Sequence, residues 1–392
     1  MRLLPSIVAC SALAFSCFAQ INPTSRQILP STFKPLPHFQ NVNLLRTINL
    51  DKGYVRENIN VVIENIDKRP QSEYYIPFPL ESISKVGGLD VRDKKDASLP
   101  PFRTQLVDFD PYNPTQFYLV TLPTPLFPGA QQTLTISYHI LSSLRPRPAK
   151  INQDGKQYLA YDFSTYWLSA YYSIKQKTKI KFPNADIPDA EPSPQEKQGS
   201  TVTYGSYDKI PAGSAQEAIV RYESTKPVTY ATLLERDVEV SQWGGNLATE
   251  ERYWMTNQGA HLQGQFSRLT WATQHNQYNN LPTSALVGLR IPLKIGSVDA
   301  YFIDDIGNVS TSRFRTNQKE SLLEAKPRYP IFGGWNYSFR IGWNGNLKDA
   351  LRRSKDNDRY ILKVPFIQGP KNSEGSSYGK VIMRVILPEG AT

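Results

Sequence analysis

The chain has 392 residues, of which 30 are proline, 23 are glycine and 11% are aromatic, and its formal net charge is +10. This length exceeds what one hydrophobic core usually serves, so two domains are expected. Frequent turn residues and abundant aromatic residues predict many short strands and argue against long helices. The basic charge is compatible with a solvated surface, nucleic acid, anionic lipids or acidic proteins as partners.

Residues 1–19 have the pattern of a secretory signal peptide. A positive charge at position 2 precedes a mostly apolar run, and Cys17 and Ala19 are small residues at the −3 and −1 positions of a cleavage site before Gln20. The second cysteine, Cys10, lies in the same segment, so the mature chain is expected to contain no disulfide and no thiolate-bound metal. Entry into the secretory pathway also argues against nucleic acid as a partner.

Residues 41–224 show repeated strand patterns. Segments 59–63 and 134–140 alternate apolar with polar side chains, which predicts a sheet with one buried face and one solvent-facing side. On a further strand, four lysines share one face and fit either the protection of a sheet edge or a basic ligand-binding stripe: Lys175, Lys177, Lys179 and Lys181.

A dense group of aromatic residues lies between positions 158 and 172. Sheet core with ordinary surface tyrosines is one interpretation. Tyrosine and tryptophan are also favoured at interfaces, so a subunit interface or a glycan-binding platform is the functional alternative. The candidates for that surface are Tyr161, Tyr166, Trp167 and Tyr171.

The domain boundary is expected around Pro227, which gives an N-terminal domain over residues 20–227 and a second domain over 228–392. Both are predicted to be β-sandwich-like, with few short helices. In the second domain, alternating apolar residues at 287–295 predict a strand that turns into a hairpin partner at 298–303. Pro292 suits an edge strand. Residues 347–353 fit one short helix with Asn346 as its cap.

Segment 327–343 is the most distinctive part of the chain and reads Pro-Arg-Tyr-Pro-Ile-Phe-Gly-Gly-Trp-Asn-Tyr-Ser-Phe-Arg-Ile-Gly-Trp. Its strand-forming residues are interrupted by Gly333 and Gly334, which indicates a bulge or a close backbone approach. Trp335 and Trp343 are expected to anchor a core or an interface.

The sequence shows no motif for catalysis or for binding a cofactor. The four histidines lack metal-ligand spacing, and neither a nucleophile elbow nor a phosphate-binding loop occurs. Asp108-Phe-Asp110 and Asp304-Asp305 are weak metal candidates, because short acidic motifs are common by chance. We therefore expect no catalytic residue, no metal and no cofactor in this chain.

Two sequons fit the N-glycosylation motif, and a signal peptide would deliver both to the compartment where that modification occurs. They are Asn308-Val-Ser310 and Asn336-Tyr-Ser338. Asn336 is expected to be the less accessible of the two because aromatic residues surround it in the sequence.

Segment 327–343 resembles the corresponding segment of the ribophorin I family, a non-catalytic subunit of the oligosaccharyltransferase complex. Segments 235–245, 304–312 and 385–391 also resemble stretches of that family. The resemblance runs from near the mature N-terminus to residue 392 and is sharpest after residue 235. It implies a structural role for the signature residues Trp243, Pro330, Phe332, Gly333, Gly334, Trp335 and Gly342.

The resemblance implies an accessory subunit in the lumen of the endoplasmic reticulum (ER). Its complex transfers a preassembled glycan from dolichyl diphosphate to Asn-X-Ser/Thr in nascent proteins. The implied partners are the catalytic and other subunits, nascent polypeptides, the translocon and the nearby ER membrane. Family members continue to a C-terminal transmembrane helix, so a truncated chain with an incomplete second domain is expected.

Two other functions stay open at this point. An enzyme on a β scaffold would need an acid/base pair or a metal cluster. A secreted glycan-binding or adhesion module would be favoured by disulfides and internal repeats.

Overall fold

The computed structural model describes residues 33–95, 98, 100–107, 113–274, 281–355 and 359–391. Within these ranges the fold is all-β, as predicted, and helix is confined to α1 (Leu80–Ile83), α2 (Arg268–Gln274) and one 3-10 turn, η1 (Leu347–Asp349). No helix in the described part of the chain is long and apolar enough to cross a membrane. The predicted signal peptide, the Asp108-Phe-Asp110 motif and His275 lie outside the described residues.

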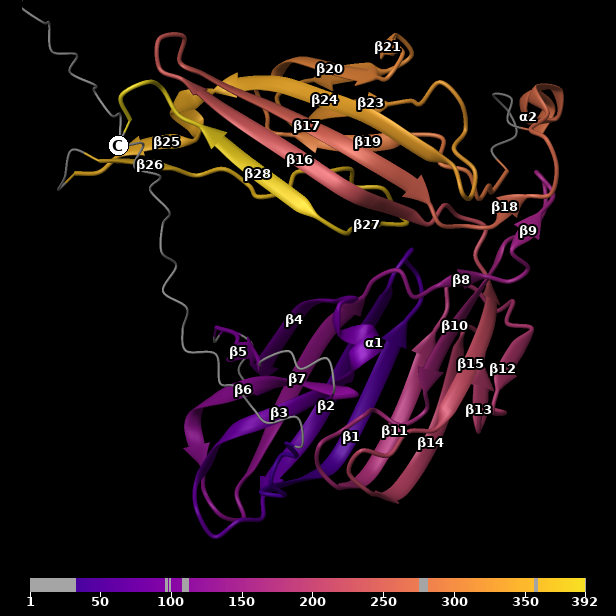
Figure 1. Cartoon of the computed structure of the whole chain (residues 1–392), viewed down its shortest axis with the longest axis vertical. Coiled ribbons are helices and arrows are strands. Elements are labelled where there is room, and N and C mark those ends of the chain that lie inside the picture. Colours follow the sequence, from indigo (N-terminus) through magenta and orange to yellow (C-terminus); the bar gives the residue numbers. More distant parts are fainter. Residues whose placement is uncertain are drawn as a thin grey trace, which may run out of the picture.

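The sheets fall into two groups, a lower one in indigo to pink and an upper one in salmon to yellow (Figure 1). The lower group is built on a seven-stranded sheet of order β13-β14-β11-β1-β2-β7-β4. A hairpin at its centre is formed by β1 (Phe39–Asn49) and β2 (Val55–Asn65), and β11 joins β1 in parallel. The other strands are β4 (Val86–Asp93), β7 (Gln131–Ile140), β11 (Ser173–Lys181), β13 (Glu196–Gln198) and β14 (Thr201–Ile210).

Two smaller sheets cover the apolar face of this large sheet. The first has the order β3-β6-β5, with β3 (Gln71–Pro79), β5 (Arg103–Leu106) and β6 (Thr115–Leu126). The second has the order β12-β15-β10-β8, with β8 (Arg145–Pro146), β10 (Tyr158–Ser164), β12 (Asp189–Glu191) and β15 (Glu217–Glu223). Each small sheet packs its own apolar cluster against the large one, so the large sheet carries two adjoining cores.

The upper group has the same plan. Its main sheet has the order β21-β20-β24-β17-β16-β27, and β28 also pairs with β16. The strands are β16 (Thr229–Ser241), β17 (Asn246–Asn257), β20 (Val298–Asp304), β21 (Gly307–Asn308), β24 (Asn336–Asn346), β27 (Ser376–Tyr378) and β28 (Val381–Ile386). One three-stranded sheet of order β19-β23-β22 contributes to its core, with β19 (Leu289–Leu293), β22 (Arg313–Thr316) and β23 (Ser321–Ala325).

Two short strand pairs complete the structure. Strand β25 (Leu351–Arg353) pairs with β26 (Tyr360–Leu362) beside the upper group. Strand β9 (Lys150–Ile151) of the lower half of the sequence pairs in parallel with β18 (His261–Leu262) of the upper half. The predicted boundary near Pro227 falls in the connection between β15 and β16.

The two groups share one strand topology, which the sequence did not reveal. The order β11-β1-β2-β7-β4 in the lower sheet corresponds to β28-β16-β17-β24-β20 in the upper sheet, with the same parallel and antiparallel neighbours. The small sheet β3-β6-β5 likewise corresponds to β19-β23-β22. The chain therefore contains two copies of one architecture, although their side chains differ.

Three local predictions need correction. Strands β19 and β20 do not form a hairpin, because the turn at 294–297 carries the chain from the small sheet, where β19 pairs with β23, to the large one, where β20 pairs with β24. The helix at 347–353 is only the turn η1 followed by β25, although Asn346 does cap it by accepting from the Lys348 amide at 3.1 Å. Strand β11 lies between β14 and β1, so its lysines cannot protect an edge. Pro292, in contrast, does lie on an edge strand, because β19 pairs with β23 alone.

Candidate functional site

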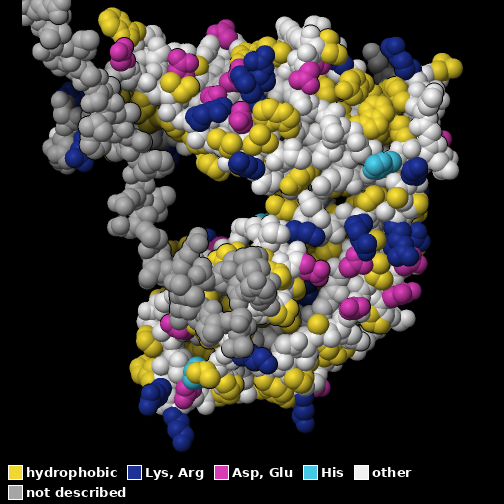
Figure 2. Space-filling view, viewed as in Figure 1, with side chains coloured by type: hydrophobic (Ala, Val, Ile, Leu, Met, Phe, Trp, Pro, Cys, Tyr) yellow, Lys and Arg dark blue, Asp and Glu magenta, His cyan; other side chains and the backbone are white. Residues whose placement is uncertain are grey.

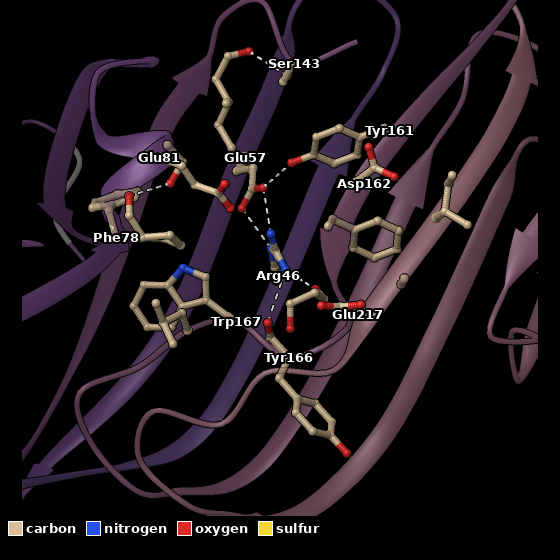
Figure 3. A pocket seen from close by; sticks show the side chains of 18 of the residues that line it. Arg46, Glu57, Phe78, Glu81, Ser143, Tyr161, Asp162, Tyr166, Trp167 and Glu217 are labelled. Atoms are coloured by element: carbon tan, nitrogen blue, oxygen red, sulfur yellow. Dashed lines mark hydrogen bonds and ion pairs between the residues drawn. The ribbon is translucent and has the colours of Figure 1, made fainter. Parts of the chain in front are cut away.

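A cavity of about 860 Å³ opens between the two small sheets of the lower group (Figure 3). Strands β1, β2 and β7 of the large sheet form its floor. One wall comes from the end of β3 and from α1, including Phe78 and Glu81, and the other from β10 and β15, including Tyr161 and Glu217. The cavity exists because the small sheets cover the same face of the large sheet side by side.

A buried ion pair forms the polar centre of the floor. Arg46 on β1 and Glu57 on β2 both point inward and are 6% and 1% exposed. The guanidinium binds the carboxylate with two hydrogen bonds, from Nε to Oε2 at 2.8 Å and from Nη2 to Oε1 at 2.7 Å. Its Nη1 donates to the carbonyl of Ser164 on β10 at 2.6 Å. Such bidentate pairing fixes both groups in one geometry.

Two tyrosines complete the surroundings of the carboxylate. Tyr138 on β7 donates to Glu57 Oε2 at 2.7 Å, and Tyr161 on β10 donates to Oε1 at 3.1 Å. Trp167 in turn donates from Nε1 to the Tyr138 hydroxyl at 3.2 Å. Four donors thus bind one carboxylate, and the network joins β1, β2, β7 and β10.

The electrostatics of this network keep it in a single protonation state. Burial acts to lower the pKa of Arg46, but the adjacent Glu57 outweighs burial and the pKa is raised. Burial, followed by the negative charge of Glu57, raises the pKa values of Tyr138 and Tyr161 well above their ordinary value. The arrangement suits holding strands together better than moving protons.

The rim of the cavity is acidic, in contrast to the basic chain. Asp162 pairs with Arg145, whereas Glu81, Glu191 and Glu217 are exposed and make no ion pair within the described ranges. Lys85 lies among them as a basic group. Tyr161 and the half-buried Phe163 stack with ring centroids 5.7 Å apart. The cavity therefore offers aromatic surface and carboxylates to a ligand, and the described residues contain no group of His, Cys, Asp and Glu that could hold a metal.

The four aromatic residues proposed for an interface do not form one exposed surface. Tyr161, Trp167 and Tyr171 are 3%, 4% and 2% exposed and belong to the cores. Only Tyr166 is half-buried, and it lines the cavity together with the buried Tyr161 and Trp167. The group therefore serves mainly as core, because strand alternation turns most of these rings inward.

A second buried pair occurs in the upper group and was not predicted. Arg236 on β16 pairs with Glu251 on β17, and the two are neighbours across the strands. Tyr253 donates to Glu251 at 2.6 Å, and the Arg236 guanidinium lies 5.6 Å from the centre of the Trp343 ring. The sequence did contain a signal for both buried pairs. In each pair, a charged residue occupies a position that the alternation of its strand turns toward the core.

The signature segment lies where backbone segments approach closely. A Cβ atom on Gly333 would lie 2.2 Å from the carbonyl oxygen of Ala260, and one on Gly342 would lie 2.3 Å from the Tyr301 ring. Gly334 has φ +79°, a conformation that other residues rarely adopt. These approaches give a physical reason for glycine at all three positions.

The aromatic residues of the same segment pack around α2. Phe332 is fully buried, with ring centroids 5.7 Å from Trp335 and 5.6 Å from Trp271. Trp335 is half-buried and Pro330 lies beside this cluster in the chain, also half-buried. The expected close backbone approach is present at Gly333, which lies against Ala260, whereas Gly334 lies against the His261 side chain.

The segment also borders the connection between the two groups of sheets. The Asn257 side chain donates to the carbonyl of Ile331 at 3.0 Å and accepts from the amide of Val228 at 3.1 Å. Gln157 of the lower group accepts from the amide of Ala260 at 2.8 Å. It also donates to the carbonyls of Ser224 and Lys226, at 2.8 and 2.9 Å. Two buried amide side chains therefore tie the connection to both groups.

Three predicted residues lie at the surface. Asn308 on β21 and Asn336 at the start of β24 are both exposed, so accessibility does not separate the two sequons. Trp243, at the turn between β16 and β17, is fully exposed, and packing among the described residues does not account for it. Asp304, by contrast, is buried and pairs with Arg328 at 2.7 Å instead of forming an acidic site with Asp305.

Comparison with known proteins identifies the family. The chain matches the family model described as Ribophorin I over residues 39–392. It belongs to the ribophorin I family. It is 32% identical over 370 residues to "Dolichyl-diphosphooligosaccharide--protein glycosyltransferase subunit 1B" of Arabidopsis thaliana, an alignment that covers 92% of this chain and 77% of that protein.

Two further ribophorin I family relatives show the same breadth of similarity, and both are named subunit 1 of the same glycosyltransferase. The protein of Schizosaccharomyces pombe is 30% identical over 366 residues, covering 90% of this chain and 77% of the relative. The protein of Caenorhabditis elegans is 32% identical over 354 residues, an alignment that covers 88% of this chain and 58% of the relative. Among solved structures, native yeast LTA4 hydrolase aligns at a TM-score of 0.32 and 10% identity over 52% of this chain and 32% of that one, which carries no functional information.

Proposed function

We propose that this chain is an accessory, non-catalytic subunit of the oligosaccharyltransferase complex. Its described part would lie in the ER lumen, beside the membrane. The observation that carries the proposal is the family match over residues 39–392, together with relatives named as subunits of this glycosyltransferase. The complex transfers a preassembled glycan from dolichyl diphosphate to Asn-X-Ser/Thr in nascent proteins.

The organisation of the cavity supports a non-catalytic role. A carboxylate acting as a general acid or base must be free to exchange a proton with a substrate. Glu57 is instead saturated by Arg46 and two tyrosines. We infer that this polar centre holds the sheets together, while the catalytic site belongs to another subunit.

Scaffolding and polypeptide presentation are the finer parts of the proposal. The two groups of sheets present broad solvent-facing β surfaces on which neighbouring subunits and the translocon could dock. The cavity, with its acidic rim and aromatic walls, has the chemistry to hold a segment of nascent polypeptide that carries basic side chains. Asn308 and Asn336 are inferred to be acceptors of glycans rather than participants in the transfer.

The test is an epitope-tag purification from detergent-solubilised microsomes, with mass spectrometry of the co-purifying proteins. Recovery of the catalytic and other oligosaccharyltransferase subunits is the expected result. A matched sample carrying Glu81→Gln and Glu217→Gln should recover the same subunits, since the rim is assigned to polypeptide and not to assembly. Recovery of none of the subunits by the unaltered chain would overturn the proposal and favour a secreted glycan-binding or adhesion module.

A further inference from the structure

The turn between β16 and β17 presents a tryptophan that no described part of the chain covers. Trp243 is 103% exposed, as open as in an extended peptide. Gly244 and Gly245 follow it, and Gly245 has φ +61°, so the turn is shaped to project its tip. Large aromatic side chains in folded proteins are usually mostly buried, so a fully exposed one at a protruding tip is a candidate for contact with a partner, provided that other exposed apolar side chains lie near it.

Other exposed apolar side chains gather at the same end. The amide of Leu347 donates to the carbonyl of Gly245 at 2.8 Å, which places η1 and the following β25–β26 pair against the turn. Strand β28 runs parallel to β16 and brings its last residue opposite Glu239, near the same tip. Figure 1 shows the turn, the end of β28 and the β25–β26 pair at the end of the upper group opposite α2. We call the exposed residues here the tip patch: Trp243, Tyr360, Ile361, Ile386 and Leu387, whose exposure ranges from 47% to 103%.

The tip patch is flanked by a basic segment. The described residues 348–355 and 359–363 contain six basic side chains and one acidic side chain, Asp349. On the β25–β26 pair, Arg352 lies opposite Ile361 and Arg353 lies opposite Tyr360, so charged and apolar side chains share one small ribbon. On the visible face of the upper group, apolar, basic and acidic side chains lie interspersed (Figure 2).

This combination distinguishes between two kinds of partner. Tryptophan, tyrosine and arginine are enriched at protein–protein interfaces as well, but lysine is depleted there, so Lys348, Lys355 and Lys363 argue against a protein partner. Membrane interfaces favour tryptophan and tyrosine at head-group depth, with lysine and arginine beside them reaching the phosphates. A projecting turn with one tryptophan tip and a basic flank fits the second set of conditions.

We propose that the tip patch contacts the surface of a lipid bilayer that carries anionic head groups. Trp243 enters the head-group layer, and the basic side chains of residues 348–355 and 359–363 bind the lipid phosphates. The turn backbone stays in the hydrated part of the interface, where its polar groups keep water as a partner. The inference goes beyond the proposed function and does not depend on it, since vesicles alone suffice to test it.

The experiment is co-flotation of the purified chain with vesicles of phosphatidylcholine, with and without phosphatidylinositol. We expect flotation with the anionic vesicles and quenching of tryptophan fluorescence by lipids brominated in their upper acyl chains. Trp243→Ala should weaken binding roughly tenfold, the scale expected for losing one buried large apolar side chain. It should leave the thermal unfolding temperature unchanged, since the ring packs against none of the described residues.

Two further variants sharpen the test. Leu269→Ala removes another exposed apolar side chain, one that is 78% exposed, from α2 at the opposite end of the upper group. This variant should bind vesicles like the unaltered chain. Arg359→Gln with Lys363→Gln should weaken binding to anionic vesicles only. The proposal is overturned if the chain floats with neither kind of vesicle, or if the Trp243→Ala variant floats as the unaltered chain does. It is also overturned if Trp243 is needed only for binding to purified subunits in detergent.

Discussion

At the scale of single residues, the lower group depends on one buried ion pair. Removing one partner of such a pair leaves the other charge buried and unpaired. Glu57→Gln should therefore lower the free energy of unfolding by about 3–5 kcal/mol. Urea denaturation measures this. Arg92→Gln, which breaks the solvent-exposed pair with Asp90, is the matched control and should cost at most about 1 kcal/mol.

The double variant Arg46→Met, Glu57→Leu separates charge from packing. Replacing both partners by apolar residues of similar volume removes the unpaired charge, so much of the stability lost in Glu57→Gln should return. Equal destabilisation by the single and the double variant would show that the tyrosine hydroxyls, left without the carboxylate, dominate instead.

Gly333 illustrates a second residue-scale constraint. An added methyl group would lie 2.2 Å from the Ala260 carbonyl oxygen, so the backbone must move. We expect Gly333→Ala to destabilise the upper group by about 1–3 kcal/mol or more, as overpacking does. Gly345→Ala is the control, because its methyl group would be 3.8 Å from the nearest atom, the Leu247 carbonyl oxygen. Equal unfolding midpoints for the two variants would contradict this account.

Both sequon asparagines are exposed, which predicts modification at two positions. In a eukaryotic secretory host, Asn308→Gln and Asn336→Gln should each remove one endoglycosidase-sensitive mobility step on a gel. Asn113→Gln is the control, since Pro114 occupies the middle position of its Asn-Pro-Thr triplet and blocks recognition. A chain whose mobility does not respond to endoglycosidase would refute the assignment of both sites.

At the scale of elements, the turn between β20 and β21 is organised by one carboxylate. Asp304 accepts from the amides of Ile306 and Gly307 at 3.0 Å each, and from Arg328 Nε and the Tyr337 hydroxyl at 2.7 and 3.1 Å. Burial acts to raise the pKa of Asp304, but these donors outweigh burial and lower it below its ordinary value of 3.8.

A lowered pKa means that the ionised Asp304 stabilises the folded state. This contribution is complete above the pKa of the unfolded chain and is lost as the pH falls through the lower, folded value. We expect the stability of the chain to decline below about pH 4. Asp304→Asn should reduce that decline and lower the stability at pH 7, measured as unfolding midpoints across pH. An identical acid dependence in both proteins would argue against this role.

The elements also show how far the sequence could predict the fold. Alternation correctly indicated the all-β class, the strand at Ile59 to Ile63 and the edge position of Pro292, because these depend on local periodicity. It could not show that β19 and β20 belong to different sheets, since pairing is decided by tertiary packing and not by the turn between them. It also missed Arg46 and Arg236, because an inward charge is recognised only once its partner on the next strand is known.

At the scale of the whole molecule, Gln157 and Asn257 link the two groups of sheets to their connection. Gln157→Ala would leave the buried amide of Ala260 without an acceptor, at a cost of about 1–3 kcal/mol. We expect faster proteolysis within residues 224–228 and a broader calorimetric transition. Gln153→Ala, which removes an exposed contact to residue 267 in the same region, should change neither. Unaltered proteolysis of Gln157→Ala would show that β9 and β18 suffice to hold the connection.

The shared topology has a consequence for folding during synthesis. In each copy, the first strand of the central hairpin receives its parallel neighbour late: β11 begins at residue 173 for β1, and β28 begins at residue 381 for β16. Pairings so distant in sequence form slowly, and an open strand edge can pair with another chain in the meantime. While a ribosome is still making the chain, each hairpin therefore exposes one edge of β1 or β16 until more than a hundred further residues have emerged. The lower copy can be completed long before the upper one, so the two architectures are expected to mature in sequence, the second only after β28 has emerged.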